Sequence, residues 1–144
     1  MIYTYTIPLP PITKKNSPQI FYMGARCPVC HKGKTARVMP SAAYLKYERA
    51  AVYYLTPKPK KPIDTPCRVV TLFYMPTLRR VDLTNLMEAA HDVLVAAGIF
   101  ADDNNTIIVS VDGSRVLYDK SNPRTEIFIE ELEDEADAHL RTLP

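Results

Sequence analysis

The chain has few cysteines and no long apolar run, and both shortages limit what it can be. It contains three cysteines in 144 residues, and an odd number does not form a disulfide framework. No apolar run reaches the length of about eighteen residues that a membrane span requires. The first residues also lack the basic-then-apolar order of a signal peptide. We therefore expect a single domain in a reducing cytoplasm.

Acidic residues are nearly missing from the first part of the chain. Residues 1–62 contain eleven Lys or Arg and one acidic residue, Glu48, which gives a formal charge of +10. The remaining residues contain seven basic and fifteen acidic side chains, or −8, so the net charge of +2 hides a strong asymmetry. A basic region attracts polyanions, and an acidic region can hold a divalent cation. An uneven but solvated surface is the alternative.

Apolar spacing and turn residues predict the order of the elements. Strands are expected over residues 1–7, 67–75, 106–117 and 125–132, and an antiparallel pairing of the last two is one arrangement. A helix is expected over residues 42–55, because Ser41 can cap it. Residues 12–40 are basic and contain Pro and Gly, which favours a long loop or ragged hairpin. Residues 56–66 form a stiff Pro-Lys connector, and residues 133–144 an acidic tail.

The stretch from residue 79 to residue 108 has the strongest pattern. Asp82 stands at an N-cap position, residues 83–97 have helical spacing, and Gly98 stands at the C-terminal stop. Six apolar residues fall within one arc of this helix, which should face a core: Leu86, Ala89, Ala90, Val93, Leu94 and Ala97.

Acidic residues follow a separate stripe of the same helix. Glu88 and Asp92 are four residues apart with no Lys or Arg on the stripe, and Asp82 lies at its N-terminal end. Like charges at this spacing destabilise a helix by about 0.2–0.5 kcal/mol. We therefore expect these carboxylates to be solvated or to be neutralised by something outside the chain.

A second acidic group follows Gly98, and the short loop can return Asp102 and Asp103 towards the stripe. Clustered oxygen ligands of this kind suit Mg²⁺ or Mn²⁺. The sequence therefore predicts a metal site that includes both groups. A solvated helix face and an ordinary Asp-Asn turn are the alternatives.

A second candidate metal site is the CxxCH motif of Cys27, Cys30 and His31. Two thiolates and an imidazole can bind zinc, but a closed zinc site needs a fourth ligand. That ligand would have to come from the fold or from a second subunit, and a plain loop with free thiols is the alternative.

Several motifs together resemble one known family. The central motif is a basic loop, D-L-x-N, a helix ending in D-x-L-x-x-x-G and then D-D, here Arg79, Arg80, Asp82, Leu83, Asn85, Asp92, Leu94, Gly98, Asp102 and Asp103. The I-P-L-P-P, K-K-N-S and P-S-x-x-Y-x-x-Y segments at residues 7–11, 14–17 and 40–47 add to it. This order is similar to that of the RusA-type Holliday junction resolvases, especially phage and prophage members, over residues 1–132.

The resemblance implies an α+β fold, a small mixed β-sheet with two main helices packed on it, and a homodimer. It also implies Mg²⁺-dependent nicking of four-way DNA junctions in recombination and repair, inside a bacterium or a phage-infected host. One nuclease domain would span residues 1–132, with a basic loop insertion at about 12–40 and the acidic tail behind it. The metal role is carried onto Asp82 and Asp103, with Asp102 adjacent.

Two positions depart from the family pattern. Many relatives have Asp where this chain has Thr84, and Lys where it has Glu88. One carboxylate is thus lost from the loop and another gained on the helix stripe. Glu88 therefore joins the candidate catalytic residues, and Glu88 and Asp92 join the candidate metal ligands.

Basic and polar residues near these motifs are the candidate DNA-binding groups. They are Lys14, Lys15, Lys58, Lys60, Lys61, Arg79, Arg80 and Asn85. Two alternatives to a junction resolvase remain open at this point. One is a non-catalytic DNA-binding module with a zinc-stabilised basic loop, and the other is a nuclease for other branched DNA.

Overall fold

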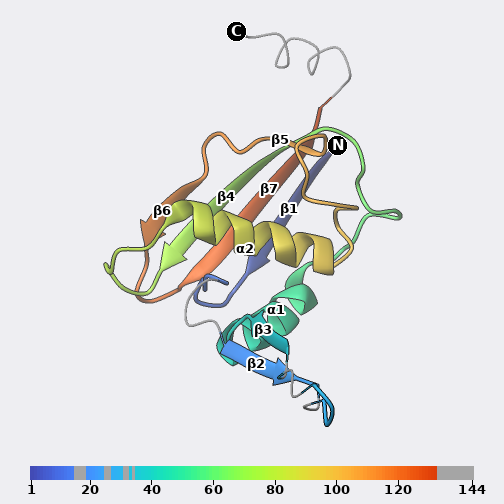
Figure 1. Ribbon diagram of the computed structural model, residues 1–144. Coiled ribbons are helices and arrows are strands. Elements are labelled where there is room, and N and C mark those ends of the chain that lie inside the picture. Colours follow the sequence, from blue (N-terminus) through green and yellow to red (C-terminus); the bar gives the residue numbers. More distant parts are fainter. Residues whose placement is uncertain (15–18, 25–26, 31–32, 34, 133–144) are drawn as a thin grey trace, which may run out of the picture.

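The computed structural model describes residues 1–14, 19–24, 27–30, 33 and 35–132. Within them the elements follow one another as β1 (Ile2–Ile7), β2 (Gln19–Met23), β3 (Thr35–Met39), α1 (Ala42–Tyr54), β4 (Cys67–Met75), α2 (Leu83–Ala96), β5 (Ile108–Ser110), β6 (Arg115–Tyr118) and β7 (Arg124–Glu131). Figure 1 shows a mixed sheet with two helices, which confirms the predicted α+β class. In this part of the chain no helix is long and apolar enough to cross a membrane.

Strand β4 is the centre of the main sheet. It pairs antiparallel with β7, and parallel with β5 near its start and β6 near its end. Strand β1 pairs antiparallel with the far side of β7. Alternate residues of β4, from Cys67 to Phe73, are buried and the residues between them are not. The sheet is therefore covered on one face, and both helices lie on that face.

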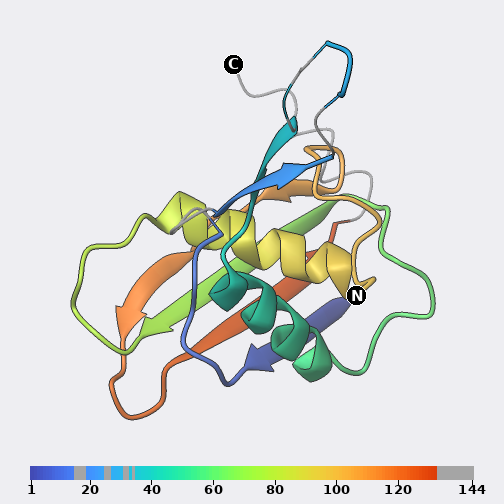
Figure 2. The same cartoon turned by 60° about the horizontal axis from the view of Figure 1, so that its bottom comes forward.

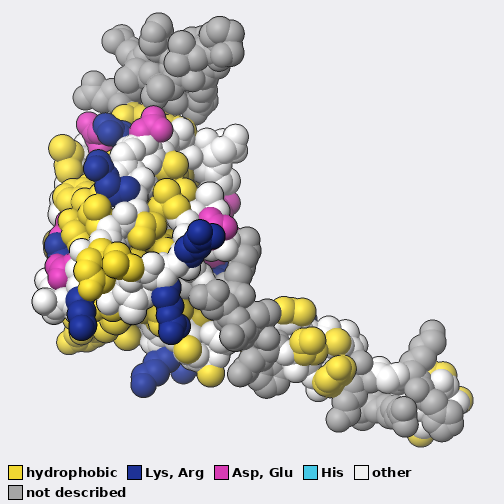
Figure 3. All heavy atoms as spheres, turned by 90° about the vertical axis from the view of Figure 1, so that its left-hand side faces the viewer, with side chains coloured by type: hydrophobic (Ala, Val, Ile, Leu, Met, Phe, Trp, Pro, Cys, Tyr) yellow, Lys and Arg dark blue, Asp and Glu magenta, His cyan; other side chains and the backbone are white. Residues whose placement is uncertain are grey.

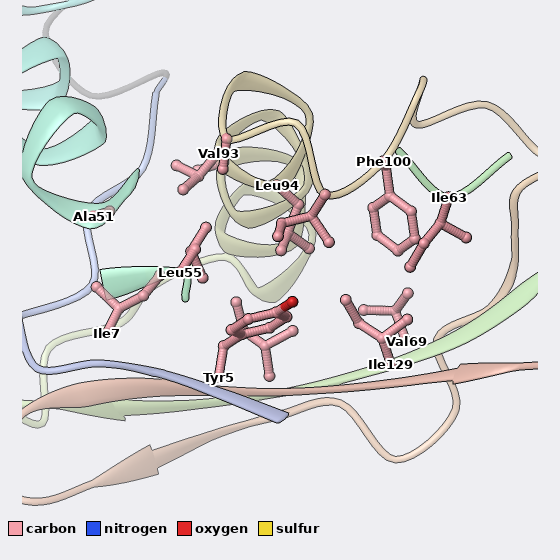
Figure 4. Packing of buried hydrophobic residues seen from close by; sticks show 14 of the residues in the cluster. Tyr5, Ile7, Ala51, Leu55, Ile63, Val69, Val93, Leu94, Phe100 and Ile129 are labelled. Carbon is pink, nitrogen blue, oxygen red and sulfur yellow. The ribbon is translucent and has the colours of Figure 1, made fainter. Parts of the chain in front are cut away.

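The main core lies between the helices and this face. Figure 4 shows Tyr5 and Ile129 of the sheet beneath Val93 and Leu94 of α2, with Leu55 following α1. All six residues of the predicted apolar arc are buried. A smaller cluster of Phe73, Leu86 and Ala90 covers the N-terminal half of α2; Met75, Val81, Leu83 and Met87 pack against it.

Both helix starts were predicted from their caps. The Ser41 hydroxyl accepts a hydrogen bond from the Tyr44 backbone N–H at 3.2 Å. Asp82 caps α2 in the same way, through the Thr84 N–H at 3.0 Å. At the other end Gly98 has φ +74°, a conformation that residues with a Cβ rarely adopt.

The predicted strand over residues 106–117 is wrong in one respect, because a turn at residues 111–114 divides it into β5 and β6. Gly113, with φ +97°, lies in this turn. The antiparallel pairing across residues 118–124 is also wrong. Strands β6 and β7 lie on opposite sides of β4, which takes the place between them.

The basic segment contains an antiparallel hairpin, β2–β3, in which Gln19 pairs with Met39 and Met23 with Thr35. This hairpin forms a sheet of its own beside the main sheet. Figures 1 and 2 show it projecting from the helix-covered side of the domain.

The Pro-Lys connector is more than a spacer. Ile63 is buried, its N–H donates to the Ile99 carbonyl at 2.8 Å, and its carbonyl accepts from the Ala101 N–H at 3.0 Å. The connector therefore holds the segment that follows α2 against the start of β4.

Candidate active site

The first residue of the candidate site is Asp82, which is exposed and is the N-cap of α2. Its Oδ1 accepts two hydrogen bonds from Thr84, from the backbone N–H at 3.0 Å and from the hydroxyl at 2.7 Å. Thr84, which stands where many relatives have a carboxylate, therefore orients the carboxylate of Asp82.

The loop before Asp82 supplies exposed cations. Leu78, Arg79 and Arg80 are exposed, whereas Val81 packs against the smaller core cluster and fixes the base of the loop. Figure 3 faces this end of the domain, and dark blue Lys or Arg side chains stand out on its surface. The predicted neighbourhood of a carboxylate and two arginines is present at the start of α2.

Asp92 has a partner that the sequence did not reveal. The Lys14 Nζ lies 2.8 Å from Asp92 Oδ2, although the two residues are 78 positions apart. The hydrogen bond with Asp92 is the main cause that raises the pKa of Lys14, and the charges of Glu48 and Glu88 add to it. The prediction that Asp92 is solvated or neutralised from outside the chain is therefore wrong, because the chain supplies the cation itself.

In the loop after α2, Asp102 and Asp103 differ in the hydrogen bonds that their side chains accept within the loop. Asp102 accepts hydrogen bonds from the Asp103 backbone N–H and from the Asn104 side-chain amide, each at 2.8 Å. The Asn104 hydrogen bond is the main cause that lowers the pKa of Asp102. Asn104 in turn accepts hydrogen bonds from the Thr106 N–H and hydroxyl. Asp102 thus shapes the turn, and the Asp103 side chain beside it is exposed.

The structure does not bring the two acidic groups together within one chain. Asp82 follows the end of β4, whereas the loop of Asp103 lies near its start, where the Cys67 N–H donates to the Ile107 carbonyl at 2.6 Å. Asp103 acts electrostatically on His91, and the helix from Asp82 to His91 is roughly 13 Å long. Figures 1 and 2 show the loop before α2 and the loop after it at opposite ends of the helix.

Asn85 and Glu88 lie on α2 between these two groups, Asn85 half-buried and Glu88 exposed. The charge of Glu88 helps to raise the pKa of Lys14, so Glu88 acts on the Lys14–Asp92 ion pair. Glu88 and Asp92 therefore act on one cation, and this cation is the Lys14 ammonium group from the N-terminal segment.

The described residues contain no group of three His, Cys, Asp or Glu side chains arranged to hold a metal ion. Mg²⁺, however, is commonly bound through one or two carboxylates together with substrate phosphates. The exposed oxygen donors of Asp82 and Asp103 fit that kind of binding. They do not fit a closed site made by one chain alone.

Of the predicted zinc ligands, Cys27 and Cys30 are free thiols, and His31 lies outside the described residues. The Cys30 backbone N–H donates to Cys27 Sγ at 3.4 Å. Hydrogen bonds from Cys30 and from the Val29 backbone lower the pKa of Cys27. This turn favours the thiolate form at Cys27, and zinc binding stays a prediction.

The predicted DNA-binding lysines do not lie beside the arginine loop. Lys58, Lys60 and Lys61 line a hollow of about 660 Å³ next to β1 and Glu131. The connector precedes β4 and the arginine loop follows it, so the strand separates them by roughly 25 Å. Lys15 lies outside the described residues.

His91 is a residue of this neighbourhood that the sequence prediction missed. Its imidazole is mostly buried, and Nε2 has no hydrogen-bond partner among the described atoms. Burial lowers the pKa of His91, while the charges of Asp103 and Asp92 raise it by less. Its place on α2 beside the buried Ala90 was the available signal.

The free energy of unfolding should fall as the pH drops below about 6.5, the usual pKa of an unfolded histidine. The unfolded chain then binds a proton that the buried His91 resists, so protonation favours unfolding, by at most about 1.4 kcal/mol per pH unit. Urea unfolding of wild type and His91→Gln between pH 7.5 and 5 measures this effect. A pH dependence that persists unchanged in His91→Gln would contradict it.

A sequence model of the endodeoxyribonuclease RusA family matches residues 23–130, well over half of the chain. No curated protein gave a match. The matched range contains the arginine loop, Asp82, the whole of α2 and the Asp102–Asp103 loop. The matched range begins at residue 23, so Lys14, which forms the ion pair with Asp92, lies outside it. The chain belongs to the RusA endodeoxyribonuclease family.

Proposed function

We propose that this endodeoxyribonuclease resolves four-way DNA junctions by paired, Mg²⁺-dependent nicks, with Mn²⁺ as a substitute, in DNA recombination and repair. The observation that carries the proposal is the start of α2. There the exposed Asp82 stands two residues after the exposed Arg79–Arg80 pair, inside the range that matches the family. A carboxylate for a divalent ion and guanidinium groups for phosphates are thus combined in one short loop.

Each residue has a role that its chemistry supports. A phosphodiester resists attack because it is anionic. A divalent ion held by Asp82 or Asp103 would neutralise the scissile phosphate and acidify the attacking water. Arg79 and Arg80 bind the phosphates next to it and orient the strand. Thr84 holds the Asp82 carboxylate through its hydroxyl.

We propose a homodimer as the active form. A four-way junction has approximate two-fold symmetry and requires two nicks, and a two-fold dimer presents two equivalent sites to it. Sedimentation of the protein with and without junction measures the oligomeric state directly.

Incubation with labelled DNA tests the proposal. We expect symmetric nicks in a four-way junction with Mg²⁺ or Mn²⁺, no nicks with EDTA, and little cleavage of linear duplex. A flap of the same sequence is the control for branch selectivity. Equal cleavage of flap and junction would indicate a nuclease for branched DNA in general. Binding without cleavage in either metal would indicate a non-catalytic DNA-binding module.

A further inference from the structure

The β2–β3 hairpin, here called the arm, has an apolar face that is open to solvent. Ile20 pairs with Val38 and Tyr22 with Ala36, and side chains two residues apart share one face of a strand. These four residues therefore share one face of the ribbon. The side chains of Ile20, Tyr22 and Val38 are 59%, 66% and 72% exposed.

The charge of the segment that contains the arm indicates the kind of partner. The segment from residue 14 to residue 37 contains six basic residues, and the first acidic residue of the whole chain is Glu48. Arg37, on β3 between Ala36 and Val38, is exposed and points to the opposite face of the ribbon. A basic segment whose hairpin is apolar on one face and carries an arginine on the other fits a polyanion that also presents flat apolar groups.

The arm is held to the domain at both of its ends. On one side Thr13 is buried, and Lys14 forms its ion pair with Asp92 of α2. On the other side Ser41, two residues after β3, is buried and caps α1. Figure 3 shows the arm projecting well beyond the domain, with yellow hydrophobic side chains on its surface. The arm therefore reaches outward from a base attached to both helices.

We propose that the arm binds the branch point of the DNA, with the apolar face of Ile20, Tyr22 and Val38 against exposed bases. In a duplex the faces of the bases are covered by their neighbours, whereas at a branch the stacking is interrupted and base faces become accessible. An aromatic ring can stack on such a face whatever the base. Arg37, on the opposite face of the ribbon, contacts the converging phosphates. This inference rests on the proposed function and adds the means by which branched DNA is selected.

Tyr22→Ala, Tyr22→Phe and Tyr53→Ala, in the full chain, test the proposal. Tyr53 is a matched control because it is 81% exposed on α1, away from the arm. Binding is measured on a four-way junction with 2-aminopurine at the branch point, and on a duplex of the same sequence. We expect Tyr22→Ala to weaken junction binding about 5- to 100-fold and to abolish the fluorescence change, with duplex affinity unchanged. Tyr22→Phe keeps the ring and should behave like wild type, as should Tyr53→Ala.

Two results would overturn the inference. One is wild-type junction binding and fluorescence in Tyr22→Ala. The other is dissociation of a wild-type dimer into monomers by Tyr22→Ala, because the apolar face would then be covered by a second copy of the chain. Failure of the proposed function looks different, since the wild-type protein itself would then not cut junctions. Cleavage by wild type together with an unchanged Tyr22→Ala variant refutes the role of the arm alone.

Discussion

Replacing Asp82 by Asn will lower the rate of junction cleavage by about a hundredfold or more, while the protein stays folded and still binds DNA. The change removes a negative charge at nearly constant shape, so a group that holds a cation fails and packing survives. Asn caps helices as well as Asp does, so the hydrogen bond from the Thr84 N–H can persist. Single-turnover cleavage, thermal unfolding and junction binding measure the three properties separately.

Asp112→Asn is the control for this experiment, because Asp112 is also an exposed aspartate in a turn but lies outside the candidate site. It should cut at the wild-type rate. An Asp82→Asn variant that cuts as fast as Asp112→Asn would remove Asp82 from the active site. A loss of binding equal to the loss of cleavage would instead assign Asp82 to the shape of the arginine loop.

Helix α2 and strand β4 were predicted from the sequence because several local signals agree in them. In α2 a cap residue, an apolar arc and a glycine stop all indicate the same boundaries, and the structure has them within one residue. In β4 the stretch from Cys67 to Met75, rich in β-branched and aromatic residues, gives the bounds that the structure shows. Prediction failed where local signals disagreed. The turn at residues 111–114 interrupts an otherwise strand-like stretch and separates β5 from β6. Strand β6 then pairs with β4, a contact between distant segments that the local sequence does not indicate.

The candidate site was harder to predict, because its geometry depends on contacts between distant segments. The spacing of Glu88 and Asp92 predicted solvation or neutralisation from outside the chain, and no rule of spacing links Asp92 to Lys14. The return of Asp103 towards Asp82 was expected from the shortness of the loop. The loop is instead held near the start of β4 by the hydrogen bonds of Ile63 with Ile99 and Ala101.

Asp103→Asn will also lower cleavage strongly, whereas Asp102→Asn will lower it less. The two residues are neighbours, but their carboxylates make different interactions. Both oxygens of Asp102 accept hydrogen bonds inside the loop, and the exposed Asp103 carboxylate acts on His91 through its charge. Loss of Asp102 should therefore loosen the turn. Loss of Asp103 should remove a cation ligand without unfolding the loop.

The imidazole of His91 reports on this substitution independently of catalysis. The charge of Asp103 raises the pKa of His91 against the larger effect of burial, so Asp103→Asn should lower that pKa further, as measured by NMR titration of the imidazole. An unchanged pKa of His91 would show that Asp103 does not lie beside the later turns of α2. Normal cleavage together with a lowered pKa would keep the placement of the loop and exclude Asp103 as a ligand. Loss of cleavage with a lowered pKa would mean that a carboxylate far from Asp82 in the same chain is nevertheless required, so that the reaction depends on acidic groups at both ends of α2.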